Sequence, residues 1–563
     1  MLPAGRRVRV AVVAAIFVSP CLAAAPAHAV VPLAGGLTDR VSTTRLGVDG
    51  NGPSGAPSVS ADGRYVAFDS VAKNLVPGDT NNARDVFVRD LRTDITKMVS
   101  VDPAGNPGNG ISETPSISAD GHFVAFQSHA ENLVADDDNL QTDIFVRNLV
   151  TGVTVRASLD SLDDDSDGPS SNASLNANGT KVAFSSLADD LVGGDLNNRR
   201  DVFVRDLTDG TTTRLSVSTT GGDSDSSSND PSIDADGSRV AFWSDASNLV
   251  AGDGNHRADV FVRDLGAGTT TRVSTAGGAD AHGNSYDPSI SADGTKVAFW
   301  STAGDLVGND GNGVSDVFLR DLGAGTTIVV SNDLGGHPAN ASSFAVALSP
   351  DATAVAFVSY ADDIATPDDD LQADVFVRDL TLGTSVRVTG DADPDAAEGE
   401  PAIANGGAVV AFSSTATTLW DGDLTGRNDV FVWQRCTIIG GDTVNDNITG
   451  TSGDDVICGL GGDDVIKGLG GNDVLIGGAG NDLLDGGGGF DRSVGGLGAD
   501  HPIGGPSGDI LLGGASNDVL TGGAGNDVII GGTGVDQLDG GAGSDACLAA
   551  PPGTAETTKN CES

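Results

Sequence analysis

The stretch PSIDADGSRVAFWSDASNLVAGDGNHRADVFVRDLGAGTTTRVS, residues 231–274, contains four short strand-like runs. Gly, Asp, Asn and Ser separate the runs, which is typical of β-strands joined by turns. We predict strands at 231–233, 240–243, 259–265 and 271–274. The stretch therefore predicts a structural unit of four short strands.

This unit recurs seven times along the chain. The tripeptide Val-Ala-Phe returns after 58, 58, 58, 57, 58 and 55 residues, and a second landmark, Asp-Val/Ile-Phe, keeps the same steps. Four strands repeated seven times predict a seven-bladed β-propeller. The two landmarks end at Phe68, Phe126, Phe184, Phe242, Phe299, Phe357 and Phe412, and at Phe87, Phe145, Phe203, Phe261, Phe318, Phe376 and Phe431.

The two ends of the repeat region predict how the propeller closes. The seventh unit stops at residues 432–434 without its fourth strand, and an unpartnered strand-like run, residues 39–42, precedes the first unit. We expect this N-terminal strand to complete the last blade. Such closure removes an open sheet edge, which would otherwise favour aggregation.

The sequence PSISADG at residues 115–121, followed by Val-Ala-Phe at 124–126, resembles the WD40-like repeat of TolB-type propellers. The resemblance covers roughly residues 38 to 434. It implies a propeller fold. It does not decide the function, because propellers of this family serve as binding platforms as often as they accompany an enzyme.

A second and shorter repeat occupies residues 450–548, which divide into eleven nonapeptides. Position one is Gly in all eleven, position four is Gly in nine, and position eight is aliphatic in eight. The glycines allow tight loops with positive φ, and the apolar segment after each Asp predicts a strand whose eighth residue points inward. Stacked coils of two nonapeptides would bring carboxylates and loop carbonyls together, a ligand set that suits Ca²⁺. The sixth position is always Asp: Asp455, Asp464, Asp473, Asp482, Asp491, Asp500, Asp509, Asp518, Asp527, Asp536 and Asp545.

The pattern Gly-Gly-x-Gly-x-Asp-x-aliphatic-x resembles the RTX, or hemolysin-type, calcium-binding repeat. The resemblance implies a parallel β-roll that folds on binding Ca²⁺, with the sixth-position Asp as a ligand. Pairing each loop with the second loop after it allows up to nine sites for eleven copies. Ser493 and Pro502 replace the inward aliphatic residue, and Ser507 replaces a fourth-position Gly. The sites that follow the pattern least well are therefore those around Asp491, Asp500 and Asp509.

The N-terminus predicts a secretory signal peptide. Three arginines within residues 6–9 precede an apolar run at 10–18, and the segment ends in Ala-His-Ala at 27–29. The alternative, a retained membrane anchor, requires a longer apolar run, and no later stretch reaches the eighteen apolar residues of a membrane span. We expect cleavage after Ala29 and a secreted protein, extracellular or on the cell surface, with no membrane span.

Four cysteines remain after the predicted cleavage, and four cysteines allow three pairings. We favour Cys436 with Cys458 and Cys547 with Cys561, because each pair closes a short loop at one end of the nonapeptide array; free thiols are the alternative. The predicted organisation is a signal peptide at 1–29, a propeller at 30–435, a β-roll at 436–548 and a disulfide-tied cap at 549–563.

The composition and the motifs limit the function. With 31 Lys and Arg against 79 Asp and Glu, the net charge of −48 makes nucleic acid a poor partner, because the field repels phosphate. The sequence has no Gly-x-Ser-x-Gly, His-Glu-x-x-His, phosphate loop or dinucleotide fingerprint, so an enzyme is the less favoured interpretation. We predict a secreted calcium-binding protein whose propeller binds an extracellular glycan or protein. The alternatives are a hydrolase or lyase with its site in the propeller funnel, using singular carboxylates such as Asp395 and Glu398, and a structural matrix component.

Some propeller residues allow two interpretations. An Asp stands six residues before each Asp-Val/Ile-Phe, and the spacing indicates either calcium in the blades or Asx turns that lead into the third strand. Trp243 and Trp300 at equivalent positions of adjacent blades indicate either a sugar-stacking platform or packing between blades. Arginines repeated in the third strand are expected to pair with nearby carboxylates. The loop aspartates are Asp79, Asp137, Asp195, Asp253, Asp310, Asp368 and Asp423.

Overall fold

The computed structural model describes residues 36–44, 48–160, 162–365, 372–389, 399–417, 419, 426–440, 444–548 and 557–561. These residues form β-strands and turns with a single 3₁₀ turn, η1 (Asn405–Gly407), so the predicted all-β fold is confirmed. None of the described segments forms a helix of the length and hydrophobicity that crossing a membrane requires. The predicted signal peptide, residues 549–556 of the predicted cap, and Asp368, Asp395, Glu398 and Asp423 lie outside the described residues.

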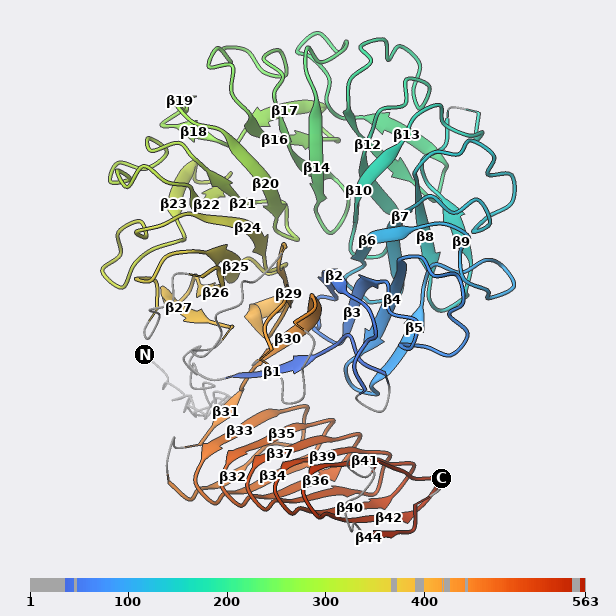
Figure 1. Cartoon of the computed structure of the whole chain (residues 1–563). Helices are drawn as coiled ribbons and strands as arrows, with labels where there is room; N and C mark the ends of the chain where they lie inside the picture. The colour runs from blue at the N-terminus through green and yellow to red at the C-terminus, as the bar shows by residue number, and fades with distance from the viewer. Residues whose placement is uncertain are drawn as a thin grey trace, which may run out of the picture. The chain divides into compact units, whose positions relative to one another are not determined.

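The first repeat system folds into seven four-stranded antiparallel sheets, which confirms the predicted seven-bladed propeller (Figure 1). The first strand of each blade lies nearest the central channel, and successive first strands are neighbours around it. The first strands are β2 (Ser54–Val59), β6 (Ser112–Ile117), β10 (Ser170–Leu175), β14 (Ser228–Ile233), β20 (Ser285–Ile290), β24 (Ser343–Leu348) and β28 (Ala402–Ile403). The second strands are β3 (Tyr65–Ser70), β7 (Phe123–Ser128), β11 (Lys181–Ser186), β15 (Arg239–Ser244), β21 (Lys296–Ser301), β25 (Ala354–Ser359) and β29 (Val409–Ser414).

The third and fourth strands complete each blade on its outer side. A short hairpin, β18 (Thr275–Ala276) with β19 (Ala279–Asp280), follows the fourth blade. The third strands are β4 (Asp85–Asp90), β8 (Asp143–Asn148), β12 (Asp201–Asp206), β16 (Asp259–Asp264), β22 (Asp316–Asp321), β26 (Asp374–Asp379) and β30 (Asp429–Arg435). The fourth strands are β5 (Ile95–Met98), β9 (Thr154–Arg156), β13 (Thr211–Arg214), β17 (Thr269–Arg272), β23 (Thr326–Val329), β27 (Thr384–Arg387) and, for the seventh blade, β1 (Gly36–Arg40).

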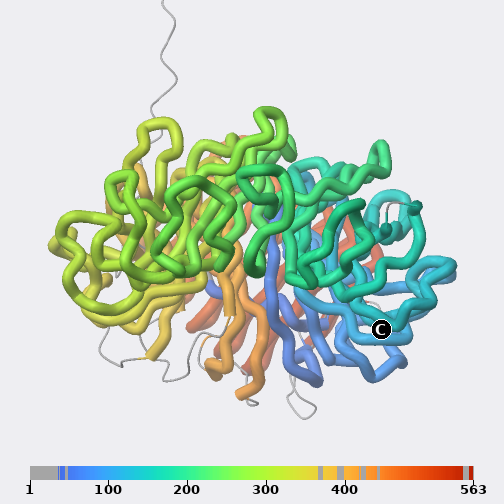
Figure 2. The backbone as a smooth tube through the Cα atoms, turned by 90° about the horizontal axis from the view of Figure 1, so that it is seen from above, coloured from blue at the N-terminus to red at the C-terminus, as the bar shows by residue number. Residues whose placement is uncertain are grey.

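The N-terminal strand closes the propeller as the sequence predicts. β1 pairs antiparallel with β30, from Gly36 opposite Arg435 to Arg40 opposite Phe431. The strand therefore begins and ends slightly earlier than the predicted run at 39–42. The orange strands of the seventh blade lie beside the blue strands of the first blade in both Figure 1 and Figure 2.

The propeller core is built from the two phenylalanine landmarks. In each blade the two rings stack at centroid distances of 5.8–6.0 Å, for example 5.8 Å between Phe68 and Phe87. Each apolar cluster joins the faces of two adjacent blades; Val86 and Val88 of the first blade, for example, pack with Val124 and Phe126 of the second. The landmarks recur because every interface between blades buries the same set of side chains.

The nonapeptides form a parallel β-roll of two seven-stranded sheets, in which each strand pairs with the strand two places later in sequence. The paired residues are eighteen positions apart, so one coil contains two nonapeptides, as predicted. The first sheet contains β31 (Ile438–Ile439), β33 (Val456–Gly461), β35 (Val474–Ala479), β37 (Arg492–Leu497), β39 (Ile510–Ala515), β41 (Val528–Thr533) and β43 (Ala546–Leu548). The second contains β32 (Asn447–Thr449), β34 (Val465–Gly470), β36 (Leu483–Gly488), β38 (His501–Gly505), β40 (Val519–Ala524), β42 (Gln537–Ala542) and β44 (Thr557–Lys559).

The inward residues of the roll form two separate apolar clusters. Ile457, Ile466, Leu475 and Leu484 belong to the first cluster, together with Ile448. The second cluster contains Leu511, Leu520, Ile529 and Leu538. Ser493 and Pro502 stand between the two clusters in sequence. Ser493 is fully buried, and its hydroxyl has no hydrogen-bond partner among the described residues.

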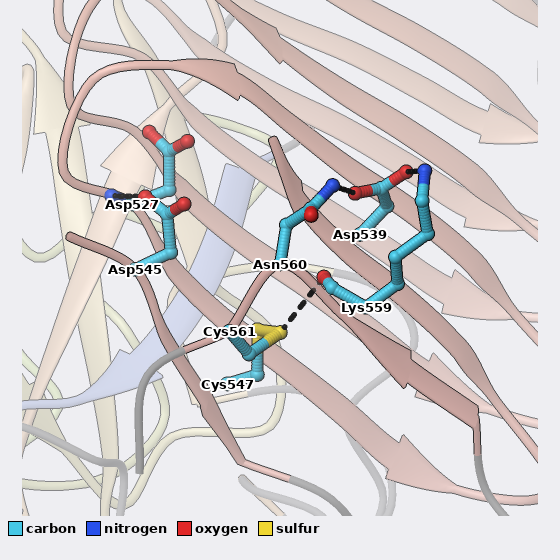
Figure 3. Close-up of a disulfide and its surroundings, with 7 residues drawn as sticks. All are labelled: Asp527, Asp539, Asp545, Cys547, Lys559, Asn560 and Cys561. Carbon is cyan, nitrogen blue, oxygen red and sulfur yellow. Dashed lines mark hydrogen bonds and ion pairs between the residues drawn. A yellow bond between two sulfur atoms is a disulfide. The ribbon is translucent and has the colours of Figure 1, made fainter. Parts of the chain in front are cut away.

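Two disulfides join the favoured cysteine pairs, Cys436 with Cys458 and Cys547 with Cys561. The second ties β44 to the last coil (Figure 3). β44 pairs in parallel with β42, and Asp539 of β42 accepts bonds of 2.7 Å from both Lys559 and Asn560. The segment 557–561 therefore adds a strand to the end of the second sheet.

Candidate metal sites

The sixth-position aspartates link successive coils of the roll. The Oδ1 atom of Asp509, for example, accepts a hydrogen bond of 2.9 Å from the backbone N–H of Asp491, one coil earlier. The bond between Asp527 and Asp545 is the last of this series (Figure 3). Each carboxylate therefore holds the loop of the preceding coil. The acceptors are Asp464, Asp473, Asp482, Asp491, Asp500, Asp509, Asp518, Asp527, Asp536 and Asp545.

The second oxygen of these carboxylates is buried and unpartnered. In all ten, Oδ2 has no hydrogen-bond partner among the described residues. In eight of them, from Asp464 to Asp527, Oδ2 lies beside the first-position glycine of its own repeat and the carbonyl of the equivalent glycine one coil later. A Cβ placed on Gly504 would lie 2.5 Å from Asp509 Oδ2 and 2.6 Å from the carbonyl oxygen of Gly522. Glycine at position one therefore leaves a space that a side chain would fill, with two oxygens facing it.

Asp455 differs from the other ten aspartates. Its Oδ2 accepts hydrogen bonds from the backbone N–H of Thr451 at 2.6 Å and from the Thr451 hydroxyl at 3.0 Å. The position eighteen residues earlier is Thr437 rather than Asp. Asp455 therefore has the arrangement of an end of the array, which the repeat pattern alone does not reveal.

Burial changes the acidity of the roll carboxylates. Desolvation raises the pKa of Asp509 and Asp518 to about 7, although a backbone hydrogen bond to each carboxylate acts in the opposite direction. The same cause raises the pKa of Asp473, Asp500 and Asp527 to about 6. Neighbouring aspartates contribute further increases, because like charges disfavour ionisation. A nearby cation would reverse both effects.

The oxygens of the roll fit a hard cation such as Ca²⁺. Calcium takes six to eight oxygen ligands, commonly carboxylates and backbone carbonyls. Each loop presents one unpartnered carboxylate oxygen together with glycine carbonyls, and an unpartnered buried carboxylate is costly without a countercharge. Across the described residues, His, Cys, Asp and Glu side chains do not gather in threes as a metal cluster. Most ligands of a calcium ion here would accordingly be backbone oxygens.

The three repeats that depart from the pattern keep the same local arrangement. Asp491, Asp500 and Asp509 are each at most 2% exposed. Each has its Oδ1 bonded to the preceding coil and its Oδ2 unpartnered, as in the regular repeats. Ser493 and Pro502 change the core behind the loops instead. Between β38 and β40 only two residue pairs are in register, which agrees with the missing N–H of proline.

In three blades, arginine occupies the place where blade calcium was considered. Nη1 of Arg214 lies 2.7 Å from Asp195 and 3.8 Å from Asp201, and Nη2 lies 2.8 Å from Asp223. Arg156 and Arg272 make the corresponding contacts in the second and fourth blades. The guanidinium supplies a counter-ion there, and the loop asparagines form Asx turns, so the structure favours the Asx-turn interpretation for these blades. This ion pair could have been predicted from the sequence, because an Arg stands nineteen residues after the loop Asp in these blades, at the end of the fourth strand.

The first and fifth blades lack this arginine. Met98 and Val329 take the place of the arginine. Pro107 and Pro338 replace the aspartate that contacts Nη2 of the arginine, here called the outer aspartate (Asp223 in the third blade). The loop asparagine still forms an Asx turn, since Asn81 Oδ1 accepts a 2.9 Å bond from the N–H of Ala83. The arginine and the outer aspartate are therefore present together or absent together in these five blades.

One expectation is corrected in part, and one open alternative is decided. The third-strand arginines bond mainly to fourth-strand hydroxyls, such as Arg263 to Thr270 at 3.1 Å, and only Arg89 and Arg205 among them also pair with a carboxylate of the described residues. The indoles of Trp243 and Trp300 pack against Tyr286, with ring centroids 5.1 and 4.8 Å apart. Both indoles also pack against the apolar clusters between blades, and their N–H groups are bonded to aspartates. The packing interpretation is the one that the structure supports.

Comparison with known protein families identifies the nonapeptide region. Segments at 440–475, 459–493, 467–502, 503–538 and 512–547 match the family model of the RTX calcium-binding nonapeptide repeat. The chain thus combines a seven-bladed propeller with calcium-binding RTX repeats. Among curated proteins, none matches this sequence.

Solved structures with a similar fold include two TolB proteins. TolB from Acinetobacter baumannii has 14% identity and a TM-score of 0.33, over 61% of this chain and 64% of that one, which is under two thirds of its length. A putative TolB from Agrobacterium tumefaciens has 19% identity and a TM-score of 0.32, over 49% and 79%. Oligogalacturonate lyase from Vibrio parahaemolyticus has 11% identity and a TM-score of 0.44, over 70% and 93%. These similarities concern the fold.

Proposed function

We propose that this chain is a secreted calcium-binding protein in which Ca²⁺ folds the β-roll and the propeller serves as a ligand-binding platform. The observation that carries the proposal is the series of ten buried carboxylate oxygens that lack a hydrogen-bond partner among the described residues. Carboxylates buried without a countercharge oppose folding, and a Gly-rich chain has little apolar surface with which to offset that cost.

The proposed ligands are the sixth-position aspartates, from Asp455 to Asp545, with the glycine carbonyls that face them. When bound, Ca²⁺ supplies positive charge between successive coils. The residues of the chain supply the other stabilising contacts of the roll. The Oδ1 bonds hold the loops in place, and the inward aliphatic side chains form its core. Extracellular calcium, at about millimolar concentration, would then keep the roll folded, while low calcium would leave it extended.

Secretion is supported by the N-terminal sequence and by the disulfides. Residues 1–29 have the basic, apolar and small-residue segments of a signal peptide. Two cysteine pairs are joined, and disulfides persist mainly in oxidising compartments. Expression of the full gene product in a bacterium, followed by N-terminal sequencing of protein from the medium, tests this part; a chain that keeps residues 1–29 contradicts it.

Circular dichroism of the full-length mature protein tests the calcium dependence. We expect chelation to remove part of the β signal and added Ca²⁺ to restore it cooperatively. Asp509→Asn should raise the calcium concentration at the midpoint, because it removes one buried carboxylate. Asp463→Asn is the matched control, since Asp463 is exposed in the neighbouring position of a loop. Identical spectra with and without calcium would contradict the proposal.

A further inference from the structure

The central channel of the propeller contains a cavity that the repeat structure alone does not require. Its volume is about 780 Å³, and residues from all seven blades line it. Towards the ends of the first strands, the channel is lined instead by apolar residues such as Ile117, Ile233 and Ile290, around a smaller space of about 130 Å³. The channel therefore has polar and apolar groups together at one end and apolar groups at the other.

An equivalent position in each blade lies beside this cavity, on the first strand in six blades and just before β28 in the seventh. In six blades the strand has a bulge at that point, and the residue has a φ between 46° and 56° although it is not glycine. The backbone is the same in each of these blades, but the side chains differ. Since folding alone would permit one residue type throughout, the differences indicate a role in binding. The residues at this position that line the cavity are Ala56, Thr114, Asn172, Asp230, Asp287 and Glu400, whereas Ala345 of the sixth blade packs in an apolar cluster.

Two of these residues are held in place by the paired tryptophans. The indole N–H of Trp243 donates a 2.5 Å bond to Asp230 Oδ2, and that of Trp300 donates a 2.6 Å bond to Asp287 Oδ2. Tyr286 packs between the two indoles. The tryptophans recognised in the sequence therefore orient carboxylates that line the cavity.

Glu400 adds a third carboxylate to the same cavity. No hydrogen bond or ion pair joins it to any residue that the structure describes, and its exposed surface opens into the cavity that it lines. Although its side chain is exposed to the cavity, desolvation by the surrounding propeller atoms raises its pKa to about 7, and the charges of Asp287 and Asp230 add to this increase. None of the charges that act on it is positive. Asp230, Asp287 and Glu400 thus share one region without a counter-ion from the described chain.

The remaining charged groups of the cavity neutralise each other. Arg84 lines the cavity but is paired with Asp69, which also accepts the N–H of Thr114 at 3.2 Å. The Thr114 hydroxyl and the Asn428 amide oxygen are buried without hydrogen-bond partners among the described residues. The cavity therefore offers three carboxylates without a cationic partner among the described residues, of which Asp230 also accepts a bond from the Asn172 amide, and additional unsatisfied polar atoms.

The chemistry of a ligand follows from these charges and from the size of the space. An anionic glycan would be repelled by the carboxylates. A single metal ion is also disfavoured, because no three acidic, His or Cys side chains of the described residues approach closely enough to hold one. We propose that this cavity binds an organic cation with two or more amine groups, through Asp230, Asp287 and Glu400. The inference rests on the proposed function of the propeller as a binding platform.

Calorimetry with spermidine tests the proposal on the full-length protein saturated with calcium, at 150 mM NaCl to suppress non-specific attraction to the acidic surface. We expect saturable binding at one site, weakened at least tenfold by Asp230→Asn with Asp287→Asn and also by Glu400→Gln. The matched control, Asp138→Asn with Asp209→Asn, removes the same formal charge from two exposed positions and should bind as the wild type does. Triethylene glycol, a neutral probe of similar length, should not bind.

Two outcomes overturn the inference: absence of saturable spermidine binding to the wild type, or equal binding by the cavity variants and the control. Near-ultraviolet circular dichroism, which reports on Trp243 and Trp300, shows whether the double variant keeps its propeller, and Glu400→Gln provides the second test if it does not. The calcium-dependent β signal of the roll is measured on the same samples. Its presence without spermidine binding contradicts the cavity proposal alone, whereas its absence contradicts the calcium proposal.

Discussion

Each regular aspartate of the roll uses its two oxygens differently. Oδ1 accepts a backbone N–H from the preceding coil, while Oδ2 is left for a cation. A change to Asn keeps an acceptor oxygen and removes the charge, so the two tasks can be separated by substitution. Asp455, at the start of the array, uses Oδ2 for Thr451 instead, and its substitution should have the smaller effect on calcium binding.

Ser493 is the residue at which the core of the roll can be improved. In the first sheet it lies between Leu475 and Leu511, and its buried hydroxyl has no partner among the described residues. We expect Ser493→Leu to raise the free energy of unfolding of the calcium-loaded roll by about 1–3 kcal/mol, because it buries apolar surface and removes an unsatisfied hydroxyl. Urea unfolding measures this.

The matched control for this substitution is Lys467→Leu, at an exposed position of β34. It should change the stability by less than about 0.5 kcal/mol. Ser493→Val serves as a second variant with a shorter side chain, in case the leucine is too large for the space. If neither variant is more stable than the control, the gap between the two apolar clusters is not a weak point.

At the scale of the blade, the arginine and its outer aspartate form a removable unit. Arg214 bridges Asp195, Asp201 and Asp223, whereas the first and fifth blades have an apolar residue and a proline in the corresponding places. The loop and strand aspartates are kept in both kinds of blade. The two arrangements are therefore alternative solutions for the same fold.

A double-mutant cycle in the third blade tests this view. Arg214→Met alone should cost about 3–5 kcal/mol, because it leaves carboxylates without their counter-ion. Adding Asp223→Pro reproduces the arrangement of the first blade and should recover part of that loss. Thermal and urea unfolding of the calcium-loaded protein give the two values. Strictly additive losses would show that the pair does not act as a unit.

The sequence predicts elements better than it predicts the contents of the channel. Blade number, closure by β1 and the two-repeat coil follow from periods of 58 and 9 residues, since repeated packing requires repeated residues. The cavity residues cannot be predicted from the repeat periods, because their residue types differ from blade to blade. The sequence does single out Trp243 and Trp300 at equivalent positions of adjacent blades. Only the structure shows that their N–H groups bond to Asp230 and Asp287. The ion pairs of Arg156, Arg214 and Arg272 were missed for a related reason: the first and fifth blades break the pattern.

For the whole molecule, the acidity of the roll predicts how pH and calcium act together. Burial raises the pKa of several sixth-position aspartates from 3.8 to about 6 or 7, so the folded roll holds protons more tightly than the unfolded chain does. Without calcium, this contribution to stability is fully present below the unfolded pKa near 4 and is lost as the pH rises through 6 and 7. Metal-free protein should therefore show more β structure at pH 5 than at pH 8. Circular dichroism of protein freed of metal on a chelating resin measures the difference, and equal signals at the two pH values would contradict the prediction.

Two series of side-chain bonds join successive coils, and they run in opposite directions along the chain. Ten sixth-position carboxylates each accept a backbone N–H that precedes them by eighteen residues. Fifth-position side chains such as Asp454 and Asp463 accept a backbone N–H that follows them by eighteen residues. Truncation from either side therefore removes acceptors from coils that remain. During synthesis, every amide of the sixth-position series is made before its acceptor exists. A coil consequently completes its sixth-position bonds only after the next coil has been made, and the bond between Asp527 and Asp545 completes the series beside the disulfide of Cys547.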